Sequence, residues 1–402
     1  MSEIVADTRE VPRFLIVFFG ALVALGPLSM DSYLPAIPAM VEYFHSDIVS
    51  INNTLAIFLI GYAIGQFFGG SFSDQIGRKP IGYIGLCIYI ASTFAVVFAS
   101  SVDQLLVLRF FQAIGGGFST VICMATVRDT YPIDELGRRF ATVTMIVLVA
   151  PLVAPTLGSL LLPFGWWTIF LFKGCYASML LVLYTRAVGE TRPGEWRNLS
   201  VGAIFKQCWN VVVRRVDGRL VPIRFALAMA LSAALLMTFV TNASFVYMGY
   251  FAISASHFPF VFGLSVVGFM SLNLFSMRRL TSSNAATFFR AGLRVQIVGA
   301  TVLALAVIMG FASIWVTVPL IVVTVSTLGL VGPSGSARYM AFFTQLAGSA
   351  SSVYTTLMFS LGGLFGWLAG VFFDGSLLPV VGVMLTATCL ANLIAVTIPT
   401  RV

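Results

Sequence analysis

The stretch GGSFSDQIGRKP, residues 69–80, places chemically distinct groups in a very short connection between two apolar runs. Asp74 can cap a helix end or pair with a cation, and Gly77 can take the positive φ that a short helix–helix turn requires. Arg78 and Lys79 add two positive charges before the second run begins. As a charge cluster alone this would be a solvated loop, so its interpretation depends on the apolar runs around it.

The composition identifies the chain as an integral membrane protein. Of its 402 residues, 59% are hydrophobic and only 9% are charged, whereas soluble proteins carry roughly 25% charged residues. The five cysteines are not spaced as a disulfide or metal framework, so we expect them to act as small apolar side chains. No cleavable signal peptide is evident, because the first 13 residues are of mixed charge and the apolar run after them is too long.

Twelve apolar runs are long enough to be membrane spans, each of which needs about 20 residues. Charged or turn-rich breaks place them at roughly 14–36, 51–72, 80–100, 104–127, 140–162, 167–187, 222–246, 256–276, 291–312, 315–337, 342–371 and 377–399. The run at 342–371 is expected to include a short loop. Hydropathy alone is also compatible with ten or eleven spans.

The basic residues orient these spans. All but two of the 23 Lys and Arg residues fall at alternate span ends, on one face of the predicted bundle. The positive-inside rule makes this face cytoplasmic, so we expect both termini inside a bacterial inner membrane and an even number of spans. This placement explains the net charge of +8 without any nucleic-acid partner. The two exceptions, Arg109 and Lys173, lie within spans.

One long polar linker, residues 188–221, divides the chain into an N-terminal bundle (1–187) and a C-terminal bundle (222–402). We predict an all-α fold of two pseudo-symmetric six-helix bundles, with a substrate site between them. Within the linker, KQCWNVVVRRV (206–216) is compatible with a basic amphipathic segment on the inner leaflet. A solvated linker explains it equally well.

Small residues at four-residue spacing predict close helix packing in three spans. The three sets are Gly61, Gly65 and Gly69; Ala150, Ala154 and Gly158; and Gly362, Gly366 and Gly370. Such faces suit a moving interface between the two halves, and they suit static packing within one half as well.

Asp31, in LSMDSYLPAIPAM (28–40), is the only charged residue between Phe14 and Val41. A carboxylate in hydrocarbon costs several kcal/mol, so its default interpretation is functional. The alternative is that the helix has already reached water by Asp31. Pro35 and Pro38 are expected to bend or end the helix just beyond it.

A depth estimate places Asp31 and Arg109 at compatible levels. At about 1.5 Å per residue, Asp31 lies about 26 Å up the first span, and Arg109 lies about 9 Å down the fourth span from the outer side. Both fall in the outer half of the membrane, within pairing range if the two helices adjoin. We predict a pair that protonation of Asp31 breaks, which changes the favoured conformational state.

Lys173 lies at nearly the level of Arg109 by the same estimate. One interpretation is that its side chain snorkels to the outer interface. Otherwise the outer cavity holds two cations against one carboxylate, which would favour anionic or zwitterionic cargo. The second half contributes no charged residue well inside a span, so we expect its share of the binding site to come from amide, aromatic and apolar groups, such as Asn242, Phe245, Tyr354 and Met358.

The pattern G-x-x-x-D-x-x-G-R-K in residues 70–79 closely resembles the loop-2/3 motif of the major facilitator superfamily. LLVLRFFQAIGGG (105–117) resembles the span-four motif of its drug:proton antiporters, and VAPLVAPTLGS (149–159) resembles their span-five motif. Three further stretches, MDSYLPAIPAM, RDTYP and NASFVYMGYFAISASHF, resemble the bicyclomycin-resistance-type (Bcr/CflA) group. The resemblance covers nearly the whole chain.

The resemblance implies roles for individual residues. It implies a conformational latch at the cytoplasmic side, made by Gly70, Asp74, Gly77, Arg78, Lys79 and Asp129. It implies a bend in span five that limits leak, shaped by Pro151, Pro155 and Gly158. It implies proton coupling by Asp31 and Arg109. We assign the same two residues to the substrate site, together with Tyr33, Gln112, Lys173, Asn242, Phe245, Tyr354 and Met358.

We therefore predict a proton-coupled exporter of small amphipathic compounds in the multidrug-efflux class, driven by the proton gradient without a cofactor or metal. It would work in the lipid bilayer as a monomer, with its substrate and H⁺ as its only partners. The alternative is a dedicated carrier, exporter or importer, of a small anionic metabolite or siderophore. An enzyme is disfavoured, because the sequence has only two histidines and neither an H-E-x-x-H nor a G-x-S-x-G motif.

Overall fold

The computed structural model describes residues 14–131, 133–191, 201–281, 283–343 and 346–399, and every element within them is helical. Residues 192–200 of the predicted linker lie outside the described part. Twelve helical stretches of the described chain are long and apolar enough to cross a membrane, which confirms the predicted number. The first of these continues to Tyr43, well past the predicted end at 36, because the apolar run resumes after a break.

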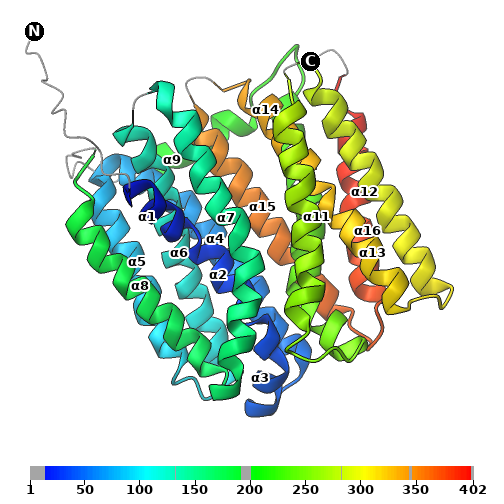
Figure 1. Cartoon of the computed structure of the whole chain (residues 1–402). Helices are drawn as coiled ribbons and strands as arrows, with labels where there is room; N and C mark the ends of the chain where they lie inside the picture. The colour runs from blue at the N-terminus through cyan, green and yellow to red at the C-terminus, as the bar shows by residue number, and fades with distance from the viewer. Residues whose placement is uncertain (1–13, 132, 192–200, 282, 344–345, 400–402) are drawn as a thin grey trace, which may run out of the picture.

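The first half of the chain forms spans one to six (Figure 1). Its elements are α1 (Phe14–Val23), α2 (Leu25–Asp31), η1 (Leu34–Ala36), α3 (Ile37–Tyr43), α4 (Ile48–Ile76), α5 (Arg78–Val96), α6 (Val102–Thr130), α7 (Ile133–Leu161), η2 (Leu162–Phe164) and α8 (Trp167–Ala187). α9 (Val201–Val212) follows in the linker. The second half comprises α10 (Val221–Ser244), η3 (Phe245–Tyr250), α11 (Phe258–Arg279), α12 (Ala285–Ile308), α13 (Ile314–Ser326), α14 (Leu328–Met340), α15 (Ala347–Val371) and α16 (Leu378–Val396).

Local chemistry sets several of these helix ends. Asp47 precedes α4 and accepts hydrogen bonds from the Ser50 N–H (2.9 Å) and hydroxyl (2.7 Å), an N-cap that satisfies an otherwise free donor. These bonds from Ser50 hold the pKa of Asp47 below its ordinary value. Ser101 caps α6 in the same way by accepting from the Gln104 N–H. Gly77 separates α4 from α5 at φ +118°, a conformation that other residues rarely adopt.

We call the end of the bundle that carries Gly77 and α9 the α9 end, and the end that carries α3 and η2 the far end (Figure 1). Two hydrogen bonds join the halves at the far end. The Ser159 hydroxyl of α7 donates to the Ala255 carbonyl at 2.7 Å, and the Ser244 hydroxyl of α10 donates to the Leu34 carbonyl at 2.6 Å. The halves are therefore tied together at the far end.

α9 contacts both halves at the α9 end. Its residues Ile204, Cys208 and Val211 are buried against the apolar core of the second half. Phe205 places its ring 5.6 Å from that of Phe67 in α4. Ile204, Cys208 and Val211 are four and three residues apart, a spacing that places them on one face of the helix. The interpretation of residues 206–216 as a solvated linker is therefore wrong for the part that lies in α9, where Cys208 and Val211 are buried, although Trp209 on another face is 63% exposed.

The glycine repeats mostly serve packing within one half. A side chain at Gly61 or Gly65 would collide with carbonyl oxygens of α6, at Phe110 and Ile114 respectively. Both helices belong to the first half, so this repeat supports static packing. In α15, Gly370 faces Val49 of α4 across the interface, so only part of that repeat separates the two halves.

Candidate functional site

The first span is broken at its buried carboxylate, Asp31. α2 ends at Asp31, and a turn leads to the short η1 helix, whose second residue is Pro35. This confirms that the helix ends beside the predicted prolines. Asp31 is only 5% exposed and the span continues through α3. The interpretation that the helix has reached water at Asp31 is therefore wrong.

Arg109 is a fully buried cation held against the end of α2. Its guanidinium donates to Gln112 Oε1 at 2.6 Å and to the Ser29 carbonyl at 3.1 Å. Gln112 Nε2 in turn donates to Thr93 Oγ1 of α5 at 2.7 Å. Since a helix carries partial negative charge at its C-terminal end, the Ser29 carbonyl is a favourable partner for the guanidinium. This network fixes α2, α5 and α6 relative to one another.

Aromatic rings complete the surroundings of Arg109. Its Cζ atom lies 4.4 Å from the ring centroids of both Tyr33 and Phe58. The Tyr33 hydroxyl is hydrogen-bonded to Thr54 Oγ1 at 2.9 Å, which fixes this ring against α4. Arg109, Gln112 and Tyr33, all predicted site residues, are therefore brought together in one buried cluster.

Asp31 and Arg109 do not form an ion pair in this structure. Within the described part of the chain, Arg109 takes its acceptors from Gln112 and Ser29, and the ion pairs found there involve other residues. Asp31 is nevertheless only two residues from Ser29, at the same helix end. The structure thus places the carboxylate next to the Arg109 network without joining it.

Lys173 of α8 is fully buried, so the interpretation that it snorkels to the membrane interface is wrong. Its Nζ atom lies 3.9 Å from the ring centroid of Phe170 and 5.4 Å from that of Tyr33. It has no hydrogen-bond acceptor in the described part of the chain. Cation–π contacts supply about 2 kcal/mol when desolvated, whereas burying an ion costs several kcal/mol. The rings alone therefore leave the ammonium incompletely compensated.

A group of aromatic rings in edge-to-face and tilted contact lies between this cluster and the far end of the molecule. Trp166 is buried between Phe170, at 6.0 Å between ring centroids, and Tyr43 of α3, at 5.2 Å. Phe44 lies 5.3 Å from the same indole. The sequence analysis did not identify these rings as part of the site, because the chain is rich in phenylalanine and most of its rings pack in the core or face lipid.

The second-half residues that we predicted are not gathered into one group. Asn242 Nδ2 donates to the Thr238 carbonyl of its own helix at 2.9 Å. Phe245 packs at the far end against Phe373, whereas Tyr354 and Met358 pack in a separate apolar cluster of the second half. The ring that contacts the first half is Phe359, 4.9 Å from Tyr62, one residue beyond Met358.

The 69–80 stretch forms an ordered ion-pair cluster rather than a solvated loop. Arg78 is 1% exposed, and its guanidinium lies 2.8 Å from Asp74 and 3.0 Å from Asp129 of α6. The same group donates to Ser73 Oγ at 2.5 Å. Gly70, one turn earlier, leaves room for Val121 of α6. Three of the predicted latch residues, Asp74, Arg78 and Asp129, are thus in contact across α4, α5 and α6.

Glu190 is a contributor to this cluster that the sequence analysis missed. Its two carboxylate oxygens accept the backbone N–H groups of Arg78 (2.9 Å) and Lys79 (3.0 Å) at the start of α5. A carboxylate at a helix N-terminus is stabilising. The signal in the sequence is weak, because Glu190 is 111 residues away from Lys79 and looks like one charge of a polar linker.

Removing the charge of Glu190 tests this cap. Glu190→Gln should lower the free energy of unfolding by about 0.3–1 kcal/mol, because the charge–dipole attraction at the start of α5 is lost. The loss should be measured by denaturant unfolding of the purified protein. Glu42→Gln, at an exposed carboxylate in the last turn of α3, serves as the control and should not lower the stability, because a negative charge there is not favoured by the helix dipole. Equal stability of the two variants would contradict this role for Glu190.

Span five carries its two prolines inside α7, at Pro151 and Pro155. Proline removes a backbone hydrogen bond within a helix and favours a bend. Three residues beyond the second proline, Gly158 meets the backbone of Ser32 so closely that a Cβ atom would overlap the Ser32 carbonyl oxygen. α7 therefore packs directly on the break in span one, next to Asp31.

Adding a methyl group at Gly158 should disrupt this packing. Gly158→Ala is expected to cost about 1–3 kcal/mol of stability, as overpacking usually does, and to reduce transport because span one is displaced. Gly382→Ala in α16 is the matched control, since nothing lies within 4 Å of a Cβ there. Thermal unfolding and transport should both be measured. A Gly158→Ala protein as stable and active as Gly382→Ala would contradict the close approach.

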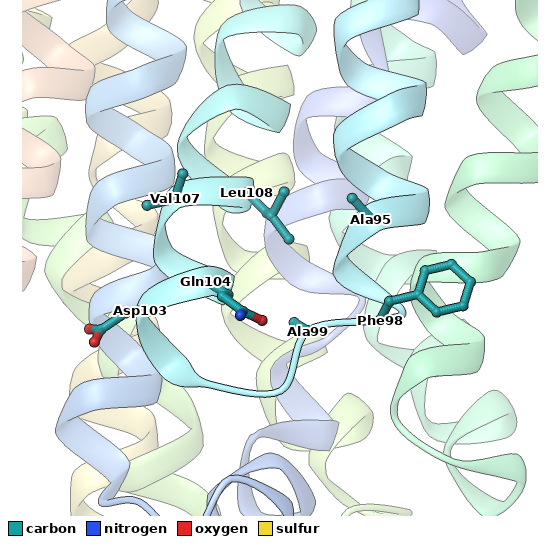
Figure 2. Close-up of a pocket in the computed structure, with 7 residues that line it drawn as sticks. All are labelled: Ala95, Phe98, Ala99, Asp103, Gln104, Val107 and Leu108. Atoms are coloured by element: carbon teal, nitrogen blue, oxygen red, sulfur yellow. The ribbon is translucent and has the colours of Figure 1, made fainter.

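Figure 2 shows a separate hollow near the far end, between α5 and α6. Its volume is about 480 Å³, and its lining residues are Ala95, Phe98, Ala99, Asp103, Gln104, Val107 and Leu108. Phe98 is 82% exposed, and the hollow includes none of the predicted site residues. It is a surface feature apart from the buried cluster.

Two bundles of membrane spans, a broken first helix with a buried carboxylate and an ion-paired turn define a membrane transporter. Residues 17–367 match the model of the Major Facilitator Superfamily, and the chain belongs to this family. It is 26% identical over 355 residues to the bicyclomycin resistance protein homolog of Haemophilus influenzae, covering 88% of each chain.

Other relatives give the same class. The chain is 25% identical over 393 residues to the multidrug resistance protein MdtL of Salmonella typhi, covering 95% of this chain and 94% of the relative. In fold it resembles the crystal structure of the POT family transporter PepTSo, with a TM-score of 0.74, 14% identity and 97% of each chain covered. The predicted family and fold are confirmed, and the protein is a transporter rather than an enzyme.

Proposed function

We propose that this protein is a proton-coupled exporter of small amphipathic compounds that works by alternating access across a bacterial inner membrane. The observation that carries the proposal is Asp31, a buried carboxylate without an ion-pair partner in the described chain, at a break in span one. The relatives named for multidrug and bicyclomycin resistance support the same class.

Asp31 would couple protons to cargo by a choice between two occupants. A charged carboxylate at membrane depth is costly unless something compensates it. A proton compensates the charge of Asp31 by binding to it, and a polar or basic group of the cargo compensates it by contact. Because one carboxylate cannot serve both at once, a proton entering from outside displaces the cargo, and cargo entering from inside displaces the proton.

Arg109 would hold the helix end beside Asp31 in place during the transport cycle. Its bonds to Gln112 and to the Ser29 carbonyl tie the end of α2 to α6. Occupancy of Asp31 then acts on a helix end that is already fixed to the rest of the bundle. A change in charge at that end favours one of two packed arrangements, as coupling requires.

The two ends of the bundle would act as alternating gates. At the far end, Ser159 and Ser244 tie the halves together, so this arrangement corresponds to a carrier closed toward the outside. At the α9 end, Arg78 links α4, α5 and α6 within the first half. We assign it the role of a latch whose ion pairs stabilise one facing state.

A second candidate function is a carrier of a small anionic metabolite or siderophore, in either direction. The buried Lys173 beside Arg109 favours it. The charge of the cargo decides whether cargo and proton move in the same or in opposite directions. An anion near Asp31 would bind best when the carboxyl is protonated. Such a cargo would move in the same direction as the proton.

Everted membrane vesicles test the main proposal. In vesicles whose lumen has been acidified, adding ethidium or bicyclomycin should release protons from the lumen as the compound enters. Vesicles lacking the protein provide the baseline. Proton uptake into the lumen when the anion 1-naphthylacetate is added instead, beyond that in vesicles lacking the protein, would support the anionic carrier. An unchanged lumenal pH with both ethidium and bicyclomycin would contradict proton-coupled export.

A further inference from the structure

Lys173 and Arg109 form a buried two-cation cluster on a shared pair of rings. Lys173 Nζ lies 3.9 Å from the Phe170 centroid and 5.4 Å from that of Tyr33. Arg109 Cζ lies 4.4 Å from the Tyr33 centroid and 5.8 Å from that of Phe170. Both side chains are completely buried. Two positive groups therefore lie on the same two rings, which are themselves 5.8 Å apart.

The described part of the chain supplies no ion-pair partner for this cluster. Neither Lys173 nor Arg109 forms an ion pair with a carboxylate in the described part of the chain. Two donor groups also have no acceptor there, the Lys173 ammonium and the Arg109 Nε–H. Both nitrogens are buried, so water at the protein surface does not satisfy them. The cluster thus lacks an acceptor with negative charge.

A carboxylate fits this requirement better than a neutral group. Its two oxygens accept several hydrogen bonds, and charge-assisted bonds to lysine and arginine are stronger than neutral ones. The rings of Tyr33, Phe58 and Phe170 surround the cations with apolar surface. These rings are packed on the cations and are themselves buried, so what the cluster lacks is the acid group of a ligand rather than further apolar contact.

We propose that the Lys173–Arg109 cluster is an anion subsite that binds the carboxylate of the transported compound. The inference rests on the second candidate function, the carrier of anionic compounds, and deepens it, because it names amphipathic compounds that bear an acid group as the cargo. The positive charge of Lys173 gives the subsite its preference for compounds with an acid group. Arg109 contributes its Nε–H while its other nitrogens hold Gln112 and Ser29.

A matched pair of probes tests the subsite on the full-length purified protein. 1-Naphthylacetate and 1-naphthylacetamide share one body and differ in the acid group. The wild type should bind the acid at least about tenfold more tightly than the amide, a difference of about 1.4 kcal/mol. Binding should be measured by calorimetry with each compound at the same pH and ionic strength.

Variants at two lysines separate the subsite from general charge effects. Lys173→Met keeps the length of the side chain, removes its charge and should bind acid and amide equally. Lys173→Gln should do the same. Lys206→Met, at an exposed cation of α9, is the control and should keep the wild-type preference. Thermal unfolding of each variant shows which of them are folded, and the wild-type comparison does not depend on any variant.

Three results would overturn the inference. The first is a wild type that binds the acid no better than the amide, or binds neither. The second is an acid preference that survives in Lys173→Met and Lys173→Gln. The third is stabilisation by free chloride that depends on Lys173 while acid and amide bind equally, which would make the cluster an inorganic-anion site. Bicyclomycin-driven proton release by wild-type vesicles would still support the proposed function in each case.

Discussion

Replacing Asp31 by asparagine should abolish gradient-driven transport while leaving the protein folded. Asparagine matches the shape of the side chain but does not take up or release a proton. Because Asp31 is 5% exposed and has no ion-pair partner in the described chain, losing its charge leaves no cation unpaired and should not destabilise the protein. Accumulation of ethidium in energised everted vesicles is expected to fall below about one-tenth of the wild-type value, since no proton drives the conformational change.

Asp103→Asn is the matched control for this prediction. Asp103 lies at the start of α6, in the surface hollow of Figure 2 and apart from the buried cluster. This variant should transport like the wild type. Counterflow without a gradient should persist in Asp31→Asn, which would show that the carrier still binds and reorients. Loss of counterflow together with a lower unfolding temperature would instead assign Asp31 a structural role.

Replacing Arg109 by methionine should have the largest effect on stability. The substitution removes the donors to Gln112 and to the Ser29 carbonyl and leaves these buried acceptors unpaired. Leaving a buried acceptor without its donor costs about 1–3 kcal/mol for each group. Arg109→Lys should recover little of this loss, because a compact ammonium cannot reach two acceptors in the geometry of a planar guanidinium.

Arg128→Met tests whether this effect is specific. Arg128 belongs to the same helix but is half exposed, and its nearest carboxylate oxygen, on Asp129, is 3.6 Å away. Its loss should change the free energy of unfolding by less than about 1 kcal/mol, as for other exposed ion pairs. Denaturant unfolding in detergent measures both variants. Similar values for Arg109→Met and Arg128→Met would contradict the buried network.

The sequence predicted the features that depend on local pattern. Hydrophobic runs together with the alternation of basic residues predicted twelve spans without tertiary information, and the prolines after Asp31 mark the break in span one. Gly77 between two helices predicted the tight turn, because the required positive φ is a property of one residue. Asp31 stood out as a single charge in an apolar run.

The partners of these residues depend on packing between distant helices, which one sequence does not reveal. Arg109 was predicted to pair with Asp31, yet its acceptors are Gln112, one turn along its own helix, and a backbone carbonyl. Backbone acceptors leave no trace in residue identity. Lys173 could face lipid or protein, and only the packing of α8 shows that it is buried. Phe359 rather than Met358 contacts Tyr62, because a step of one residue rotates the direction of a helical side chain by about 100°.

The central claim is that Asp31 couples cargo movement to protons, and lumenal pH in proteoliposomes tests it most directly. Purified wild-type protein and Asp31→Asn should be reconstituted at equal density with a pH indicator inside, and ethidium should then be added outside. We expect the wild type to release protons from the lumen, and we expect no pH change with Asp31→Asn although ethidium counterflow continues. Proton release of wild-type size by Asp31→Asn would contradict the central claim.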